Sequence, residues 1–164
     1  MLLVIMGVSG TGKSTLGHLL AQQSGWEFWD GDDFHPEANV QKMAAGIPLE
    51  DEDRYPWLKA IHRHLAQLEA HNQSGIIACS ALKAQYRTLL SEGLNTVKFV
   101  WLTGEASLIA HRMQARSAHF MPSSLLASQL ATLEDPEDAV KLDIAHSPED
   151  LAQQVWKELG VSIK

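Results

Sequence analysis

A run of eight residues near the start of the chain has the composition of a phosphate-binding loop. Residues 7–14 read G-V-S-G-T-G-K-S, a full match to the pattern G-x-x-x-x-G-K-S. The glycines let backbone N–H groups approach phosphate oxygens, Lys13 can reach the β- and γ-phosphates, and the Ser14 hydroxyl is placed to ligate Mg²⁺. We therefore expect a nucleoside triphosphate to bind Gly7, Val8, Ser9, Gly10, Thr11, Gly12, Lys13, Ser14 and Thr15.

An acidic cluster farther along the chain could supply a base and a metal ligand. Asp30, Asp32 and Asp33 follow an apolar segment of strand composition, and ligands of an open parallel sheet bind beyond the carboxyl ends of its strands. One carboxylate could orient Mg²⁺ and another could accept the proton of an attacking hydroxyl group. We favour Asp30 for the metal and Asp32 for the proton, and the sequence leaves open how the three acids divide these roles. His35 adjoins the cluster and is kept as a candidate site residue.

Cationic side chains occur at three further places where an anionic ligand could bind. They are Arg54, then Lys83 with Arg87, then Arg112, Arg116 and His119. Lys83 and Arg87 are four residues apart, so on a helix they share one face and could clamp a carboxylate. The last group borders a segment that we expect to form a lid, where cations would offset the charge of a transferring phosphoryl group and closure would exclude water. Each group also has an alternative interpretation. Arg54 could be incidental at an acidic helix N-terminus, Lys83 and Arg87 could be solvated surface charges, and the last group could be a basic helix end that favours its own dipole.

The composition narrows the class of protein. The chain has 164 residues, enough for one compact domain, and a net charge of −7 that argues against nonspecific binding to nucleic acid. No segment approaches the roughly 20 apolar residues of a membrane span, and we expect no signal peptide. The single cysteine, Cys79, excludes an internal disulfide and fits a reducing cytoplasm. The eight histidines form no pattern of metal ligands.

The elements that must position these residues alternate between strand and helix, which predicts an α/β fold of the P-loop NTPase class. We expect a parallel sheet of about five strands, with helices on both faces and a small mobile lid at about residues 116–122. Strands are expected at residues 2–6, 26–29, 75–79, 97–102 and 139–144. Helices are expected at residues 14–24, 36–45, 51–72, 84–90, 106–116, 123–133 and 148–159. No repeat or linker divides the chain, so we expect one domain over residues 1–164.

Taken together, the motifs resemble the gluconate kinases (gluconokinases), P-loop kinases of small molecules that are related to shikimate and nucleoside monophosphate kinases. The resemblance extends over nearly the whole chain. Beyond the phosphate loop it rests on D-G-D-D-F-H-P at residues 30–36, D-E-D-R-Y-P-W-L at residues 51–58, and C-S-A-L-K-A-Q-Y-R at residues 79–87. It implies transfer of a phosphoryl group from ATP to the 6-hydroxyl of D-gluconate, with Mg²⁺, in a protein that is often a homodimer.

The residues and the resemblance together predict a role for each candidate. Lys13, Asp32 and Arg116 would be catalytic, Arg112 would join the phosphate loop at the nucleotide, and Ser14 and Asp30 would hold the metal. The substrate would contact Asp32, His35, Arg54, Lys83, Arg87 and His119. Two other functions stay open: a kinase of another small acidic acceptor, such as shikimate or a nucleoside monophosphate, and a module that binds ATP without transferring its phosphate. Acceptor-dependent release of ADP distinguishes them.

Overall fold

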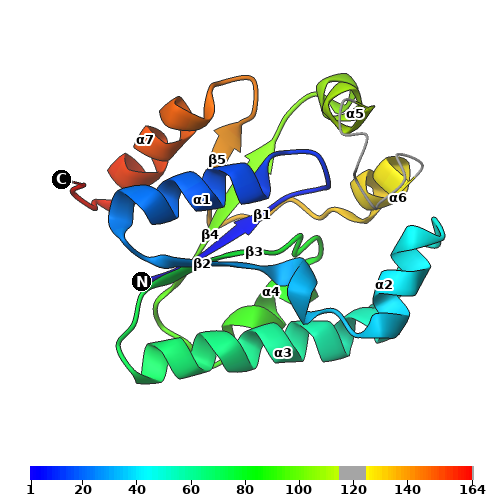
Figure 1. Cartoon of the computed structure of the whole chain (residues 1–164), viewed down its shortest axis with the longest axis horizontal. Coiled ribbons are helices and arrows are strands. Elements are labelled where there is room, and N and C mark those ends of the chain that lie inside the picture. Colours follow the sequence, from blue (N-terminus) through cyan, green and yellow to red (C-terminus); the bar gives the residue numbers. More distant parts are fainter. Residues whose placement is uncertain (115–124, 164) are drawn as a thin grey trace.

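A parallel sheet of five strands forms the centre of the part of the chain that the structure describes, residues 1–114 and 125–163 of a computed structural model (Figure 1). In chain order the strands are β1 (Leu2–Met6), β2 (Glu27–Asp30), β3 (Gly75–Ala78), β4 (Val97–Thr103) and β5 (Ala139–Asp143). They lie side by side in the order β2-β3-β1-β4-β5, and every neighbouring pair is parallel. The predicted five-stranded parallel sheet is confirmed.

Helices cover both faces of the sheet (Figure 1). They are α1 (Lys13–Ser24), α2 (Glu37–Ala44), α3 (Asp51–Ala70), α4 (Ala84–Ser91), α5 (Ala106–Gln114), α6 (Leu125–Thr132) and α7 (Pro148–Leu159), with a 3₁₀ turn η1 (Gly31–Phe34) after β2. Helices α1 and α7 cover one face and α3 and α4 the other. Among the described residues, no helix is long and apolar enough to cross a membrane.

Strand β1 shows why the central strands are continuously apolar. All five of its side chains are fully buried. Because successive side chains point to opposite faces, Leu3 and Ile5 join the core under α1 and α7, whereas Leu2, Val4 and Met6 join the core above α3 and α4. A strand covered on both faces by helices has no position left for a polar residue.

The parallel arrangement brings three sequence motifs to one edge of the sheet. Ala78, the last residue of β3, is in register with Ile5 of β1 and with Asp30 of β2, so the three strands end together. The phosphate loop follows β1, η1 follows β2, and residues 79–83 follow β3. Gly31 opens η1 against β3, where a Cβ atom would lie 2.2 Å from the Ala78 carbonyl oxygen, so only glycine fits.

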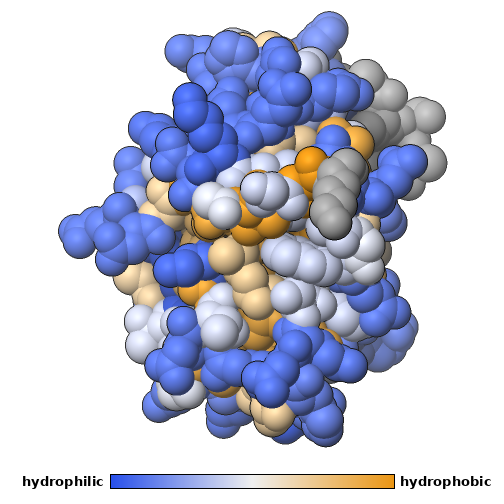
Figure 2. Space-filling view, turned by 90° about the vertical axis from the view of Figure 1, so that its left-hand side faces the viewer, coloured by the Kyte–Doolittle hydropathy of each residue, from blue (hydrophilic) through white to orange (hydrophobic). Residues whose placement is uncertain are grey.

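The opposite end of the molecule carries the amino ends of the strands and both chain termini. Figure 2 shows this end as hydrophilic above and below, with a band of more apolar side chains across its middle, between the two helical layers. Helices α2, α5 and α6 lie instead near the carboxyl ends of the strands (Figure 1). The candidate site residues that the structure describes are therefore gathered at the carboxyl end, as open parallel sheets place their ligands.

Candidate active site

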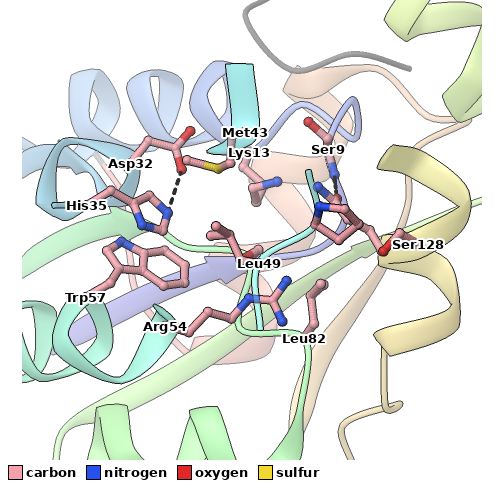
Figure 3. A pocket seen from close by; sticks show the side chains of 13 residues that line it. Ser9, Lys13, Asp32, His35, Met43, Leu49, Arg54, Trp57, Leu82 and Ser128 are labelled. Carbon is pink, nitrogen blue, oxygen red and sulfur yellow. Dashed lines mark hydrogen bonds and ion pairs between the residues drawn. The ribbon is translucent and has the colours of Figure 1, made fainter. Parts of the chain in front are cut away.

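A pocket opens where β1, β2 and β3 end (Figure 3). It is lined by Ser9, Lys13, Asp32, His35, Met43, Pro48, Leu49, Arg54, Trp57, Ser80, Leu82, Ser128 and Gln129. Five of the predicted site residues meet here, and they come from three separate segments: Ser9, Lys13, Asp32, His35 and Arg54. In Figure 3, Lys13 and Ser9 face the pocket from the phosphate loop, and Arg54 extends toward it from α3.

Contacts within the phosphate loop fix its conformation at the N-terminus of α1. Gly12 precedes α1 with a φ of 92°, a left-handed conformation that favours glycine, and the helix begins at Lys13. The Thr11 hydroxyl donates to the Val8 carbonyl oxygen at 2.9 Å inside the loop. The Lys13 ammonium donates to the carbonyl oxygens of Gly7 and Val8, each at 3.0 Å. A helix N-terminus with an adjacent ammonium is a favourable site for phosphate groups.

Gln129 connects α6 to this loop. Its side-chain carbonyl oxygen accepts a hydrogen bond from the backbone N–H of Ser9 at 2.7 Å. We did not predict Gln129 as a site residue, because no local spacing relates it to a loop 120 residues earlier. The same holds for Ser80 and Ser128, whose positions in the pocket depend on the packing of β3 and α6.

The structure separates the three acids of the cluster. The Asp30 carboxylate caps η1 by accepting a hydrogen bond from the Asp32 N–H at 2.9 Å. The Asp32 side chain is 50% exposed and lines the pocket, with Oδ1 lying 4.0 Å from the His35 Nε2. Asp30 and Asp33 are not among the lining residues. Of the three carboxylates, Asp32 is therefore the one placed to meet a ligand in the pocket.

His35 is buried beside Asp32 rather than exposed to solvent. Its side chain is only 3% exposed, and its ring stacks on Trp57 with the centroids 4.0 Å apart and the planes 15° apart. Burial and the nearby positive charge of Arg54 lower the pKa of His35 to about 4. The imidazole is therefore neutral near pH 7.

Hydrogen bonds link Arg54 to Lys83 through Tyr86 and Asp51. Of Arg54 and Lys83, only Arg54 lines the pocket. Arg54 Nη1 donates to the Tyr86 hydroxyl at 2.9 Å, and that hydroxyl donates to the Asp51 carboxylate. Lys83 donates to the same carboxylate at 2.8 Å. These bonds lower the pKa of Asp51, and the bond from Lys83 contributes most. The ammonium of Lys83 is thus paired with an acid of α3 beside the pocket.

Arg87 bonds to backbone carbonyl oxygens and does not share a helix face with Lys83. Its guanidinium donates to the carbonyl oxygens of Ala81, Leu82 and Glu134, at 2.8, 3.2 and 2.8 Å, and the residue is 8% exposed. Helix α4 begins at Ala84, so Lys83 precedes the helix instead of sharing a face with Arg87. The two side chains point to different partners. Arg87 holds together the backbone behind the pocket and is not part of its lining.

A second pocket lies on the other side of the phosphate loop. It is lined by Gly10, Thr11, Gly12, Thr15, Leu16, Arg112, His146, Pro148 and Leu151. Arg112, predicted at the nucleotide, lies here with the loop, and its Nη2 donates to the Ile144 carbonyl oxygen at 2.6 Å. The predicted Arg116, His119 and lid at about residues 116–122 lie outside the described residues.

The chain is similar to known proteins in both sequence and fold. A protein-family model described as shikimate kinase matches residues 9–158. The chain is 45% identical over 155 residues to the thermosensitive gluconokinase of Escherichia coli (strain K12), across 92% of this chain and 83% of that protein. It is 48% identical over 136 residues to a gluconokinase of Gluconobacter oxydans (strain 621H), across 83% and 76% of the two chains. The crystal structure of a gluconokinase from Sinorhizobium meliloti 1021 superposes with a TM-score of 0.87 at 44% identity, covering 96% of this chain and 90% of that one.

Proposed function

The chain belongs to the shikimate kinase family and, within it, to the gluconokinases, and on that premise we propose that it phosphorylates D-gluconate. The reaction transfers the γ-phosphoryl group of ATP to the 6-hydroxyl and yields 6-phospho-D-gluconate and ADP. The observation that carries this proposal is the pocket itself. It places a half-exposed carboxylate, Asp32, and a guanidinium, Arg54, in one cavity with Lys13 of the phosphate loop.

In this proposal, the nucleotide extends from one side of the phosphate loop to the other. Its phosphates bind the loop N–H groups and Lys13 at the N-terminus of α1. The base end extends into the second pocket, between Arg112 and His146. The γ-phosphate then lies at the mouth of the first pocket, where Lys13 and Ser9 are part of the lining.

We propose one orientation for the acceptor in the first pocket. Its carboxylate pairs with Arg54, since a guanidinium offers parallel N–H donors that match a carboxylate. Its terminal hydroxyl then lies toward Asp32, which accepts the proton as the oxygen attacks phosphorus. Lys13 and the N-terminus of α1 offset the charge that develops on the phosphoryl oxygens. We assign the same effect to Arg116, and substrate contacts to His119.

Mg²⁺ fits the residues present, and we propose Ser14 and Asp30 as its protein-side partners. Ser14 is half-buried in the first turn of α1, and Asp30 is the last residue of β2, which β3 separates from β1 in the sheet. Among the described residues no group of three or more His, Cys, Asp or Glu side chains could form a metal cage. Mg²⁺ in kinases takes most ligands from water and phosphate, so two protein oxygens suffice. When bound, the ion neutralises phosphate charge.

Two further proposals concern the state of the protein in the cell. The single cysteine, Cys79, is buried, and burial raises the pKa of its thiol to about 12, so the chain carries no reactive thiol of its own. This supports a role in the reducing cytoplasm.

The resemblance to gluconokinases supports a homodimer, which sedimentation of the purified protein would test.

Release of ADP tests the proposed function directly. Purified protein with Mg-ATP is given D-gluconate, shikimate, AMP or no acceptor, and the phosphorylated product is identified by ³¹P NMR. We expect turnover with D-gluconate and a product phosphorylated on the terminal hydroxyl. Turnover with only shikimate or only AMP would show that D-gluconate is not the acceptor. The assignment of the chain as a kinase of small molecules would then still hold. Binding of ATP without acceptor-dependent release of ADP would contradict the proposal.

A further inference from the structure

We propose that Asn39 is a positioning residue, which holds His35 in the tautomer that carries its proton on Nε2 and so turns an N–H donor toward Asp32. The tautomer is a property of the folded chain alone. Its effect on turnover rests on the proposed function, in which Asp32 is the base. Neither the sequence motifs nor the comparisons assign any role to Asn39.

The hydrogen bonds of Asn39 determine which way its amide points. The residue is 2% exposed and lies in the first turn of α2. Its side-chain nitrogen lies 2.7 Å from the Asp53 carbonyl oxygen and 3.1 Å from the His35 Nδ1. A carbonyl oxygen can only accept, so the NH₂ group must face Asp53. The second N–H of the same group then points at Nδ1, which must be the accepting nitrogen.

The proton of a neutral imidazole consequently sits on Nε2. His35 is neutral because burial against Trp57 and the charge of Arg54 lower its pKa to about 4. The groups that face the ring from the packed elements are Asp32 on η1, Arg54 and Trp57 on α3, and Asn39 on α2. Among the described residues, the Asp32 carboxylate lies 4.0 Å from Nε2, and a carboxylate is a hydrogen-bond acceptor.

The donor at Nε2 has a direct consequence for the base. The distance of 4.0 Å from Nε2 to Asp32 Oδ1 is too long for a hydrogen bond (Figure 3). Asp32 is half-exposed, and the proposal requires its side chain to rotate until this gap closes. A bond to Oδ1 stabilises the ionised carboxylate and orients it toward the hydroxyl group whose proton it receives. The opposite tautomer would set a nitrogen lone pair against the carboxylate and would repel it.

The tautomer can be read without any activity measurement. Long-range ¹⁵N–¹H spectra of the protein labelled at its histidines distinguish an acceptor-type nitrogen from an N–H nitrogen, and the spectrum of His35→Gln identifies the His35 signals. We expect Nδ1 to be acceptor-type and Nε2 to be protonated, with no titration from about pH 5 to about pH 8. A protonated Nδ1, or a charged ring at neutral pH, would overturn the proposal.

The Asn39→Asp variant tests the cause. Its carboxylate can accept from Nδ1 but cannot donate to it, and its negative charge raises the pKa of His35. We expect the proton to move to Nδ1 and His35 to titrate within that pH range. An unchanged tautomer that still does not titrate would show that Asn39 does not control it.

A pair of variants at His35 tests the consequence, even if Asn39→Asp does not fold. The amide nitrogen of Gln reaches the place of Nε2, whereas that of Asn reaches only the place of Nδ1, and both variants lose the stacking on Trp57. We expect kcat of His35→Gln to exceed that of His35→Asn by about tenfold to a hundredfold, the effect of one hydrogen bond to a charged group. The KM for ATP should stay equal in both variants.

His62→Gln is the matched control, since His62 lies on α3 and its Nε2 contacts the Glu92 carbonyl oxygen away from the pocket. Its kcat should be unchanged. Equal kcat values for the two His35 variants would overturn the role of the Nε2 donor. If wild-type protein phosphorylates no acceptor, the proposed function fails, but the spectra still decide the tautomer.

Discussion

Replacement of Arg54 by Gln should weaken the use of D-gluconate about a hundredfold and leave the KM for ATP unchanged. Arg54 lines the first pocket, and its Nη1 already donates to the Tyr86 hydroxyl at 2.9 Å. A guanidinium has five N–H donors, so this bond leaves others for a carboxylate. Two charge-assisted bonds of about 1.5 kcal/mol each amount to about 3 kcal/mol, which is about a hundredfold in kcat/KM.

The assay compares two acceptors that differ at one end, where one carries a charged carboxylate and the other a neutral amide. The kcat/KM of wild type and of Arg54→Gln is measured with D-gluconate and with the neutral D-gluconamide, at saturating Mg-ATP. The loss caused by the substitution should appear with D-gluconate and largely vanish with D-gluconamide, because the amide offers no charge to pair. Arg54→Lys keeps a charge without the planar pair of donors, so its kcat/KM with D-gluconate should lie between those of wild type and Arg54→Gln. Arg63→Gln, an exposed position on the same helix, is the matched control and should change neither value.

Two results would refute this reasoning. A loss of less than about threefold with D-gluconate would show that the carboxylate pairs elsewhere. An equal loss with both acceptors would show that Arg54 acts by supporting Tyr86 and Asp51, and not by pairing with the substrate.

Three further predictions concern the base, the buried arginine and the buried histidine. Asp32→Asn should lower kcat about a hundredfold to ten-thousandfold in steady-state assays, with ATP affinity unchanged. Arg87→Met should lower the free energy of unfolding in urea by about 3 kcal/mol, since three backbone carbonyl oxygens lose their donor. His35 has a folded pKa of about 4, below its usual 6.5, so stability should fall by about 3 kcal/mol as the pH falls from 6.5 to 4. His35→Gln should flatten that part of the curve of Tm against pH.

Each of these predictions has an outcome that would contradict it. Near-normal turnover of Asp32→Asn would show that Asp32 is not the base. An Arg87→Met variant with wild-type stability but a raised KM for D-gluconate would show that Arg87 binds the substrate, as the sequence predicts. The sign for His35 follows from proton binding: between the two pKa values the unfolded chain binds a proton that the folded chain excludes, so stability must rise with pH there. A flat wild-type curve would contradict the buried, neutral ring.

Much of the fold could be predicted because its signals are local. Residues 2–6 are an unbroken apolar run followed directly by the phosphate-loop pattern, and both features lie within residues 2–14. The strand ends differ from the expected ones by at most one residue, since strand formation in a doubly covered sheet depends on runs of apolar side chains. The gluconokinase resemblance is likewise confirmed by the comparisons. The lid remains a prediction, because it falls outside the described residues.

The site was predicted less completely, and Arg87 shows why. Its spacing from Lys83 is correct for one helix face, but the helix begins only after Lys83, and the turn before it offers carbonyl oxygens that a buried guanidinium must satisfy. The choice among Asp30, Asp32 and Asp33 was also beyond the sequence. It depends on Asp30 capping η1, a local geometry that any of the three acids could have adopted.

The sequence by itself determined the chemistry that this chain carries: a phosphate loop, a cluster of acids beyond a strand, and scattered cations in a chain of net charge −7. Only the tertiary structure decided which of these groups meet. Asn39 and the Asp53 carbonyl, Ser9 and Gln129, and Arg54 and Tyr86 are joined by hydrogen bonds across 14, 120 and 32 positions. Such bonds depend on direction and on a few tenths of an ångström, and these are set by how strands and helices pack, not by the spacing of residues along the chain.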